Sequence, residues 1–128
     1  MKRTPMKTRY SGTGPPPDVV DAVYERAGHS CELCEAAVGP ERGVDHHLHH
    51  RRPRRAGGSK RPDTNLPSNL LLLCPTCHDV VESRRIAGYE NGWILRSTAK
   101  PTEVPCTIRR GTREVFLTDA GRYSTEPS

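Results

Sequence analysis

Residues 49–78 read HHRRPRRAGGSKRPDTNLPSNLLLLCPTCH, and this stretch decides the fold of the 128-residue chain. It begins with two adjacent histidines and continues through a run rich in arginine, proline and glycine. An asparagine, Asn69, then directly precedes four leucines, and a Cys-x-x-Cys-His sequence ends the stretch. The proline- and glycine-rich run predicts a loop, and the four leucines predict a short buried strand.

The elements predicted around this stretch are short. Apolar patterning predicts a helix over 18–28, a strand over 44–50 and a helix from Cys77 to about Gly88. The loop over 51–68 is long for so small a domain, and such loops are usually functional or disordered. The predicted order is therefore helix, strand, long loop, strand and helix.

The chain has the length of one domain with two less regular ends. Residues 1–17 are basic, rich in proline, glycine and threonine, and predict a disordered arm. The main domain is predicted over 18–100, with its core at about 28–88. The remaining residues, 101–128, predict a C-terminal extension with short strands and a frayed end.

The composition indicates a thin core and an anionic partner. Only 33% of the residues are hydrophobic and 5% aromatic, so a bound metal would help to stabilise the fold. The net charge of +5 favours a nucleic acid, and ordinary solubility is the alternative explanation. Six basic residues lie beside the histidines and are the predicted nucleic-acid contacts, the alternative being a solvated loop. They are Arg51, Arg52, Arg54, Arg55, Lys60 and Arg61.

The N-terminus has charges but no apolar stretch, which excludes a signal peptide. The longest strongly apolar run, residues 70–73, is too short to cross a membrane. The predicted location is therefore the cytoplasm, with no membrane partner. In that reducing compartment, paired cysteines favour zinc over disulfide bonds.

Two Cys-x-x-Cys pairs, Cys31 with Cys34 and Cys74 with Cys77, predict one structural zinc ion. Each pair forms a tight turn that lets both sulfurs reach the same tetrahedral ion. The pairs lie farther apart than in a compact zinc ribbon, as expected if the histidine-rich stretch folds between them. Two unrelated pairs of buried thiols are the alternative. Cys106 has no partner and is predicted to be a small core residue.

Over about residues 28–88 the chain resembles the HNH endonucleases, and its small phage-encoded members especially. The resemblance rests on Arg-x-x-Gly-Gly, on Asn-Leu before the leucine run and on Cys-x-x-Cys-His. It implies a small zinc-stapled α+β domain with a ββα-metal (His-Me finger) active-site unit, an N-terminal helix and short C-terminal strands. It also implies metal-dependent hydrolysis of DNA phosphodiester bonds, by nicking, by double-strand cutting or by both.

The register of the motif depends on which histidine is the general base. In the family this histidine is followed by proline three residues later and by two glycines seven and eight residues later. Only His50 fits, because Pro53 and the glycines at 57–58 occupy those positions. His46 and His47 do not fit, and they are expected at the surface beside the strand, with contact to metal or DNA as the alternative.

The resemblance then implies a role for each site residue. His50 is the general base, since a neutral imidazole can take a proton near neutral pH. His49 and His78 ligate a catalytic divalent cation, which is Mg²⁺, Mn²⁺, Ni²⁺ or Zn²⁺. Asn69 ties down the loop or orients the base, with a turn-forming surface asparagine as the alternative. Glu82 lies one helical turn after His78 and is either a further ligand or a solvent-facing side chain.

Phage relatives also suggest partners, namely DNA and the subunits of a DNA-packaging terminase, in the host cytoplasm if the chain is phage-encoded. The alternative function is a non-catalytic, zinc-stapled protein that binds DNA as a packaging accessory. His50 separates the two, because a binding module has no need of a base beside two metal ligands.

Overall fold

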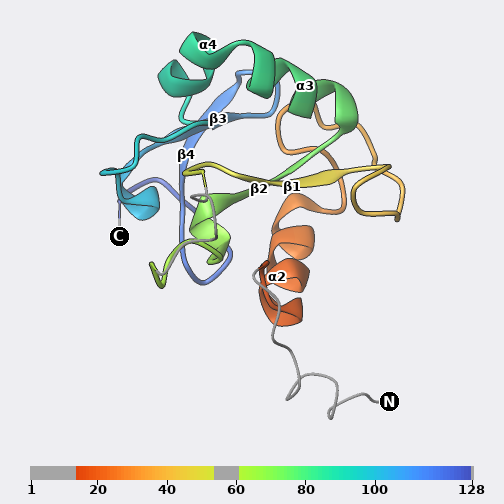
Figure 1. Cartoon of the computed structure of the whole chain (residues 1–128), viewed down its shortest axis with the longest axis horizontal. Helices are drawn as coiled ribbons and strands as arrows, with labels where there is room; N and C mark the ends of the chain where they lie inside the picture. Colours follow the sequence, from red (N-terminus) through yellow and green to blue (C-terminus); the bar gives the residue numbers. More distant parts are fainter. Residues whose placement is uncertain (1–13, 54–60, 128) are drawn as a thin grey trace.

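Two small antiparallel sheets and three α-helices make up the described part of the chain (Figure 1). The computed structural model describes residues 14–53 and 61–127. The α-helices are α2 (Pro17–Ala27), α3 (Pro75–Ser83) and α4 (Arg85–Glu90), and the 3-10 helices are η1 (Pro67–Asn69) and η2 (Pro101–Glu103). The strands are β1 (His47–His50), β2 (Leu70–Leu73), β3 (Cys106–Ile108), β4 (Arg113–Leu117) and β5 (Tyr123–Ser124).

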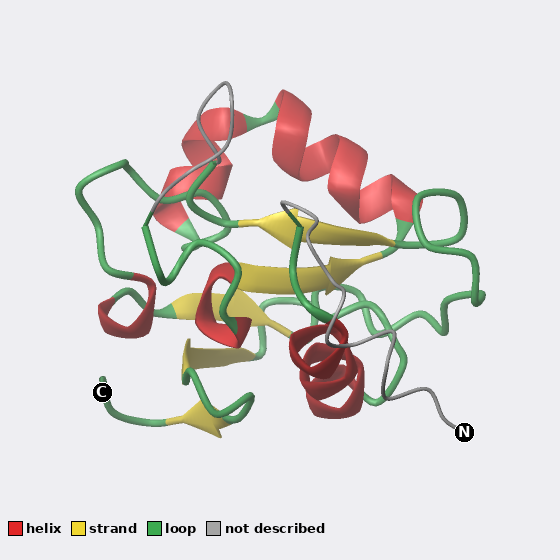
Figure 2. Ribbon diagram, turned by 60° about the horizontal axis from the view of Figure 1, so that its bottom comes forward, coloured by secondary structure: helices red, strands yellow, loops and turns green. Residues whose placement is uncertain are grey.

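Strands β1 and β2 form the first sheet, which lies between α2 on one side and α3 with α4 on the other (Figure 2). The strands are antiparallel, and their register pairs His47 with Leu73 and His50 with Leu70. Helix α3 contacts both strands, so the histidines of β1 lie close to it. This strand–strand–helix unit brings residues 47–50 and 75–83 together.

The leucine run forms β2 because both faces of this strand are covered. All four leucines are fully buried, although alternate residues of a strand point in opposite directions. Leu71 and Leu73 pack into the larger core cluster, whereas Leu70 and Leu72 pack against Val23 of α2. A strand covered on both faces has a continuous apolar sequence rather than an alternating one.

The second sheet has the order β3–β4–β5 and belongs to the same core. Cys106, Ile108, Val115 and Leu117 are buried in one cluster with Leu71 and with residues of α3 and the Cys31 turn. The segment predicted as an extension with short strands thus supplies, through β3 and β4, one side of the main core. The lone cysteine, Cys106, is fully buried in that core.

A buried carboxylate, Glu32, connects four parts of the fold. It accepts two hydrogen bonds of 2.8 Å from Arg26 of α2, one of 2.8 Å from the backbone N–H of Leu72 and one of 2.7 Å from the Tyr123 hydroxyl. Burial lowers the pKa of Arg26, but the adjacent Glu32 raises it above the usual arginine value. Because Glu32 lies inside the first Cys-x-x-Cys turn, this network anchors that turn to the sheet.

Several boundaries differ from the sequence-based prediction. Strand β1 begins at His47 rather than at residue 44, and the helix expected from Cys77 to Gly88 begins at Pro75. Proline suits the first turn of a helix because its φ angle is fixed and its missing N–H would be unpaired there. The backbone leaves the helical region at Arg84 (φ −115°, ψ 73°), so the expected single helix becomes α3 and α4.

The predicted arm over 1–17 is described only from residue 14, and its last residue begins α2; residues 1–13 lie outside the described part of the chain. The predicted loop over 51–68 contains η1, and residues 54–60 of this loop also lie outside it. None of the helices in the described ranges is long and apolar enough to cross a membrane.

Candidate metal centres and catalytic histidine

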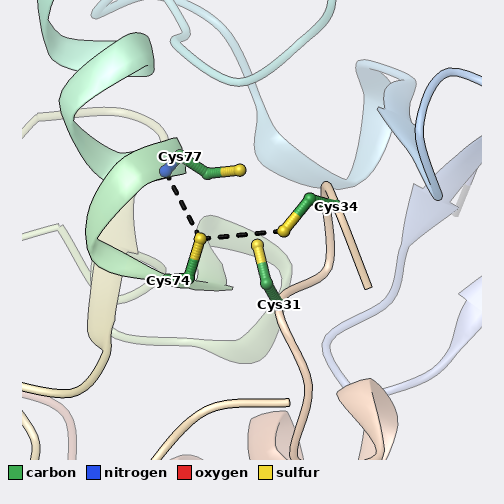
Figure 3. Close-up of side chains that lie close together, drawn as sticks. All are labelled: Cys31, Cys34, Cys74 and Cys77. Carbon is green, nitrogen blue, oxygen red and sulfur yellow. Dashed lines mark hydrogen bonds between the residues drawn. The ribbon is translucent and has the colours of Figure 1, made fainter. Parts of the chain in front are cut away.

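The four paired cysteines meet at the start of α3 (Figure 3). Cys31 and Cys34 come from the turn after α2, Cys74 is the N-cap residue of α3, and Cys77 lies in the first turn of that helix. All four sulfur atoms lie within 4.8 Å of one another, and the Sγ atoms of Cys34 and Cys74 are 3.7 Å apart. Tetrahedral zinc with Zn–S bonds of about 2.3 Å requires sulfur–sulfur distances of about 3.8 Å. The cysteine geometry therefore fits a zinc ion.

The chemistry of the four thiols also fits a cation. Burial raises the pKa of Cys31, and burial together with the neighbouring Cys31 raises that of Cys77. Four thiolates this close together would repel one another unless a positive charge lay between them. The backbone N–H of Cys77 also donates to the sulfur of Cys74, which caps the first turn of α3. The cluster is thus joined to the helix that carries half of it.

A second cluster lies farther along α3 and consists of His49, His78 and Glu82. His49 belongs to β1, whereas His78 and Glu82 are one turn apart on α3 and share a face of it. Glu82 Oε2 is 3.5 Å from His49 Nδ1 and 3.8 Å from His78 Nε2, and the ligand atoms all lie within 4.8 Å. Two imidazoles and one carboxylate suit several divalent metals and do not select one of them.

The tautomer of His49 leaves Nδ1 available as a ligand. Its Nε2–H donates a hydrogen bond of 2.8 Å to the backbone carbonyl of Trp93, so the lone pair is on Nδ1, the atom nearest Glu82. Burial lowers the pKa of His49 to about 4, although the Trp93 carbonyl and Glu82 oppose that shift. His49 is therefore neutral near pH 7, as a metal ligand must be.

His50 follows the potential ligand His49 and forms its hydrogen bond with a different partner. Its Nε2–H donates a hydrogen bond of 2.8 Å to the Oδ1 atom of Asn65. A neutral ring with its proton on Nε2 carries its lone pair on Nδ1. His50 also lines a cavity of about 330 Å³ together with His49, His78 and Glu82. A potential proton acceptor and three potential metal ligands thus share one cavity.

Asn69 is fully buried and bonds only to backbone atoms in the described structure. Its Oδ1 accepts from the N–H of Arg52 at 2.8 Å, and its Nδ2 donates to the carbonyls of Arg52 at 3.2 Å and Thr64 at 2.9 Å. These bonds tie the end of β1 to the loop, so Asn69 is no turn-forming surface residue. The side chain that contacts the His50 ring is Asn65, which the sequence pattern did not single out.

Residues 31–84 match the family model described as HNH endonuclease. This part of the chain is an HNH endonuclease domain. The match begins at Cys31 and extends just beyond Glu82, so it contains both clusters of potential metal ligands. No curated protein and no solved structure matched the chain. The predicted family and the α+β fold class are therefore confirmed, and the domain indicates a nuclease-type function.

Arg51 and Arg52 of the HNH domain are buried, whereas the predicted contacts with nucleic acid require exposed side chains. Arg51 has no exposed surface. Its guanidinium donates to the backbone carbonyls of Gly92, Ser68, Pro101 and Val104, at 2.8 to 3.0 Å. Burial lowers the pKa of Arg51. This side chain joins distant backbone segments, and the prediction that it contacts DNA is corrected.

Arg52 is also buried, with 5% of its surface exposed, and it forms an ion pair with Asp63. The hydrogen bond from Arg52 lowers the pKa of the Asp63 carboxyl. A further hydrogen bond of 2.8 Å goes to the carbonyl of Ala99. Its predicted contact with DNA is corrected for the same reason. Of the other predicted contacts, Arg61 is exposed and donates to the Ser97 carbonyl, whereas Arg54, Arg55 and Lys60 lie outside the described residues.

The two remaining histidines of the run are not simple surface residues either. His46 is only 3% exposed and bonds at 2.9 Å to the carbonyl of Gly39 and at 2.7 Å to the hydroxyl of Tyr24. His47 stacks on the ring of His78, with the ring centroids 4.2 Å apart. His46 therefore has a structural position, and His47 packs on the potential ligand His78 from outside the cluster.

Proposed function

We propose that this HNH domain is a metal-dependent endonuclease that hydrolyses DNA phosphodiester bonds, with His50 as its general base. The observation that carries the proposal is the hydrogen bond from His50 Nε2–H to Asn65. That bond leaves a lone pair on Nδ1 of a ring that lines the same cavity as the cluster of His49, His78 and Glu82. A nuclease needs both a base for water and a cation for the phosphate at one site.

His49, His78 and Glu82 would hold the catalytic divalent cation. When bound, such a cation stabilises the negative charge that develops on the phosphate and on the leaving oxygen. Two of the donors are imidazole nitrogens, and His49 is kept neutral by its burial. Glu82 belongs in this set because its carboxylate approaches both rings, and this supports its role as a third ligand.

The protein side chains then carry out the proton transfer. His50 Nδ1 takes a proton from a water molecule as the water oxygen forms a bond to phosphorus. The bond between phosphorus and the 3′ oxygen breaks, and that oxygen gains a proton from solvent. The products are a 5′-phosphate and a 3′-hydroxyl. By accepting from Nε2–H, Asn65 favours the tautomer in which the neutral ring presents its lone pair at Nδ1, the atom that takes the proton.

The four cysteines would hold a structural zinc ion that stabilises the fold and takes no part in the reaction. Such a site has four protein ligands and leaves no position for substrate. It would join the turn at Cys31 and Cys34 to the first turn of α3, directly before His78. The zinc would thereby fix the helix that supplies two of the three catalytic ligands.

A plasmid-nicking assay with added Mg²⁺, Mn²⁺, Ni²⁺ or Zn²⁺ tests the proposal. The intact chain should nick the plasmid, and His50→Ala should do so at least about 100-fold more slowly while still binding DNA and zinc. His29→Asn is the matched control, because His29 is exposed and has a positive φ angle (58°) that asparagine tolerates. Wild-type cleavage by His50→Ala would contradict the assignment of the base.

The rival function is a zinc-stapled domain that binds DNA without cutting it. It predicts the same zinc content and the same DNA binding, but no nicking with any of the four metals. Association with the subunits of a DNA-packaging terminase stays a prediction from the resemblance to phage proteins. Co-purification of the chain with terminase subunits would test that partner separately from the chemistry.

A further inference from the structure

Arg85 brings a positive charge to the cavity that holds His50 and the three potential metal ligands. Its side chain lines this cavity of about 330 Å³, and it is the only arginine or lysine among the described lining residues. Arg85 is exposed, and within the described part of the chain no carboxylate forms an ion pair with it. Its guanidinium is therefore available to a ligand in the cavity.

A second arginine is held close to Arg85 by one aromatic ring. The guanidinium carbon of Arg96 is 4.4 Å from the ring centroid of Tyr89, and that of Arg85 is 5.8 Å from the same centroid. Arg85 Nη2 also lies 3.4 Å from the Tyr89 hydroxyl. Tyr89 is half-buried and packs against the main core, so its ring is a fixed support for both arginines.

Two guanidinium groups beside one ring repel each other, and this repulsion is relieved when an anion binds between or beside them. Arg96, like Arg85, is exposed and has no ion pair with any carboxylate in the described ranges. A guanidinium also presents its N–H donors in a plane that matches the oxygens of a phosphate. Evenly spaced phosphates along a nucleic-acid strand would satisfy both groups at once.

We propose that Arg85 and Arg96 bind two phosphates of one DNA strand, with Tyr89 as their common support. Arg85 would bind the scissile phosphodiester inside the cavity, and Arg96 a neighbouring phosphate outside it. The proposal rests on the endonuclease function proposed above and names the residues that hold its substrate. It also replaces the buried Arg51 and Arg52 as the basic contacts near the catalytic histidine.

The two arginines have different expected effects because only Arg85 lines the cavity. An N–H donor beside the reacting phosphate stabilises the charge of the transition state, so Arg85→Gln should lower kcat by about 100-fold. Arg96→Gln should raise KM several-fold and leave kcat unchanged. Arg85→Lys should keep the affinity for DNA but recover only part of kcat, because an ammonium group lacks the planar pair of donors.

The test separates binding from cutting by using the non-cutting chain His50→Ala. Titration of a labelled duplex across a salt series gives the slope of the logarithm of affinity against the logarithm of salt concentration. Arg85→Gln and Arg96→Gln, each added to His50→Ala, should each reduce that slope by about 0.9. Arg113→Gln is the matched control. Arg113 is also exposed, and its guanidinium carbon is 5.7 Å from the ring centroid of a tyrosine, Tyr123, but its side chain does not line the cavity. Its slope should not change.

Steady-state cleavage by the chain with His50 intact completes the experiment, with melting temperature and zinc content measured for every variant. If Arg85→Gln and Arg96→Gln keep the wild-type slope, kcat and KM, the proposal is overturned. It is equally overturned if Arg113→Gln reduces the slope as much as they do, or if the chain does not bind duplex DNA. If the slopes change as expected but the intact chain cuts with none of the metals, the phosphate surface stands and the endonuclease function fails.

Discussion

Helix α3 contributes side chains to two clusters of potential metal ligands, and these clusters differ in how exposed to solvent they are. The cysteine cluster has four sulfur donors, and all four cysteines pack within or against the main core. The histidine cluster has three donors, borders a cavity, and includes a Glu82 side chain that is 52% exposed. A closed set of four ligands suits a structural ion, whereas three ligands beside a cavity leave positions for water and substrate. The difference in openness therefore supports the proposed assignment of a structural role to the cysteine cluster and a catalytic role to the histidine cluster.

The histidine cluster is also expected to depend on the cysteine cluster more than the cysteine cluster depends on it. Cys77 and His78 are consecutive residues, so whatever fixes the start of α3 also fixes a ligand of the histidine cluster. Loss of the histidine cluster leaves the cysteine turn and its Glu32 network in place. Damage to the cysteines should therefore abolish both sites, and damage to the histidine site should abolish only one.

The largest effect is expected from Cys74→Ala. Metal binding in small zinc domains supplies folding free energy, about 10 kcal/mol, so this variant should lose its zinc, its cooperative melting and its cleavage of DNA together. Elemental analysis, circular dichroism and the nicking assay measure the three losses. Cys106→Ala is the control, because Cys106 is buried outside the cluster and this variant should keep about one zinc ion per chain. A well-folded, zinc-free Cys74→Ala would contradict the comparison.

A smaller effect is expected from Glu82→Gln, which changes only the open cluster. The variant should keep its zinc and its melting temperature, whereas the affinity for the catalytic metal should fall by about 10-fold or more. Excess metal should then restore most of the nicking. Glu90→Gln, an exposed substitution on α4, serves as the control. A metal-titration midpoint equal to that of the wild type would remove Glu82 from the ligand set.

Asn65→Ala should affect the catalytic cavity without affecting either metal. Without the Oδ1 acceptor, the Nε2–H tautomer of His50 loses its stabilising partner, so kcat should fall by at least about tenfold while KM is kept. Nitrogen chemical shifts of the His50 ring should show a mixture of tautomers. Asn65→Asp retains an acceptor oxygen and should recover much of kcat. Unchanged ring shifts in Asn65→Ala would show that Asn65 does not set the tautomer.

The parts of the fold and of the site that follow local spacing could be predicted from the sequence. A Cys-x-x-Cys turn brings two sulfurs together whatever surrounds it, and four consecutive leucines between turn signals favour a strand buried on both faces. His78 and Glu82 share a helix face because they are four residues apart. The family and fold class followed from these patterns, and the family match over 31–84 confirms the family.

Contacts between distant segments could not be predicted in the same way. The run of arginines after His50 looks uniform in sequence, yet Arg51 turns into the interior to meet carbonyls of residues as far away as Val104. The phosphate contacts proposed for Arg85 and Arg96 depend on the position of Tyr89 relative to a cavity. Charge in a sequence indicates an anionic partner, but the direction of each side chain is set by tertiary packing.

The smallest expected effect is a pH-dependent change in stability caused by His49. Burial lowers the pKa of His49 to about 4, and the pKa of histidine in an unfolded chain is about 6.5. Between these values the unfolded state binds more protons, so stability falls as the pH drops through this window. From about pH 7.5 to about pH 5.5, the free energy of unfolding should fall by about 1 kcal/mol more in the wild type than in His49→Gln.

The His49→Gln variant has no imidazole that could gain a proton in this pH range, and its amide can still donate to the Trp93 carbonyl. Urea titrations of both zinc-loaded chains, without added catalytic metal, measure the difference. An equal pH dependence in the two chains would mean that His49 is not held neutral by burial, and the open cluster would then lose the feature that prepares it for a metal.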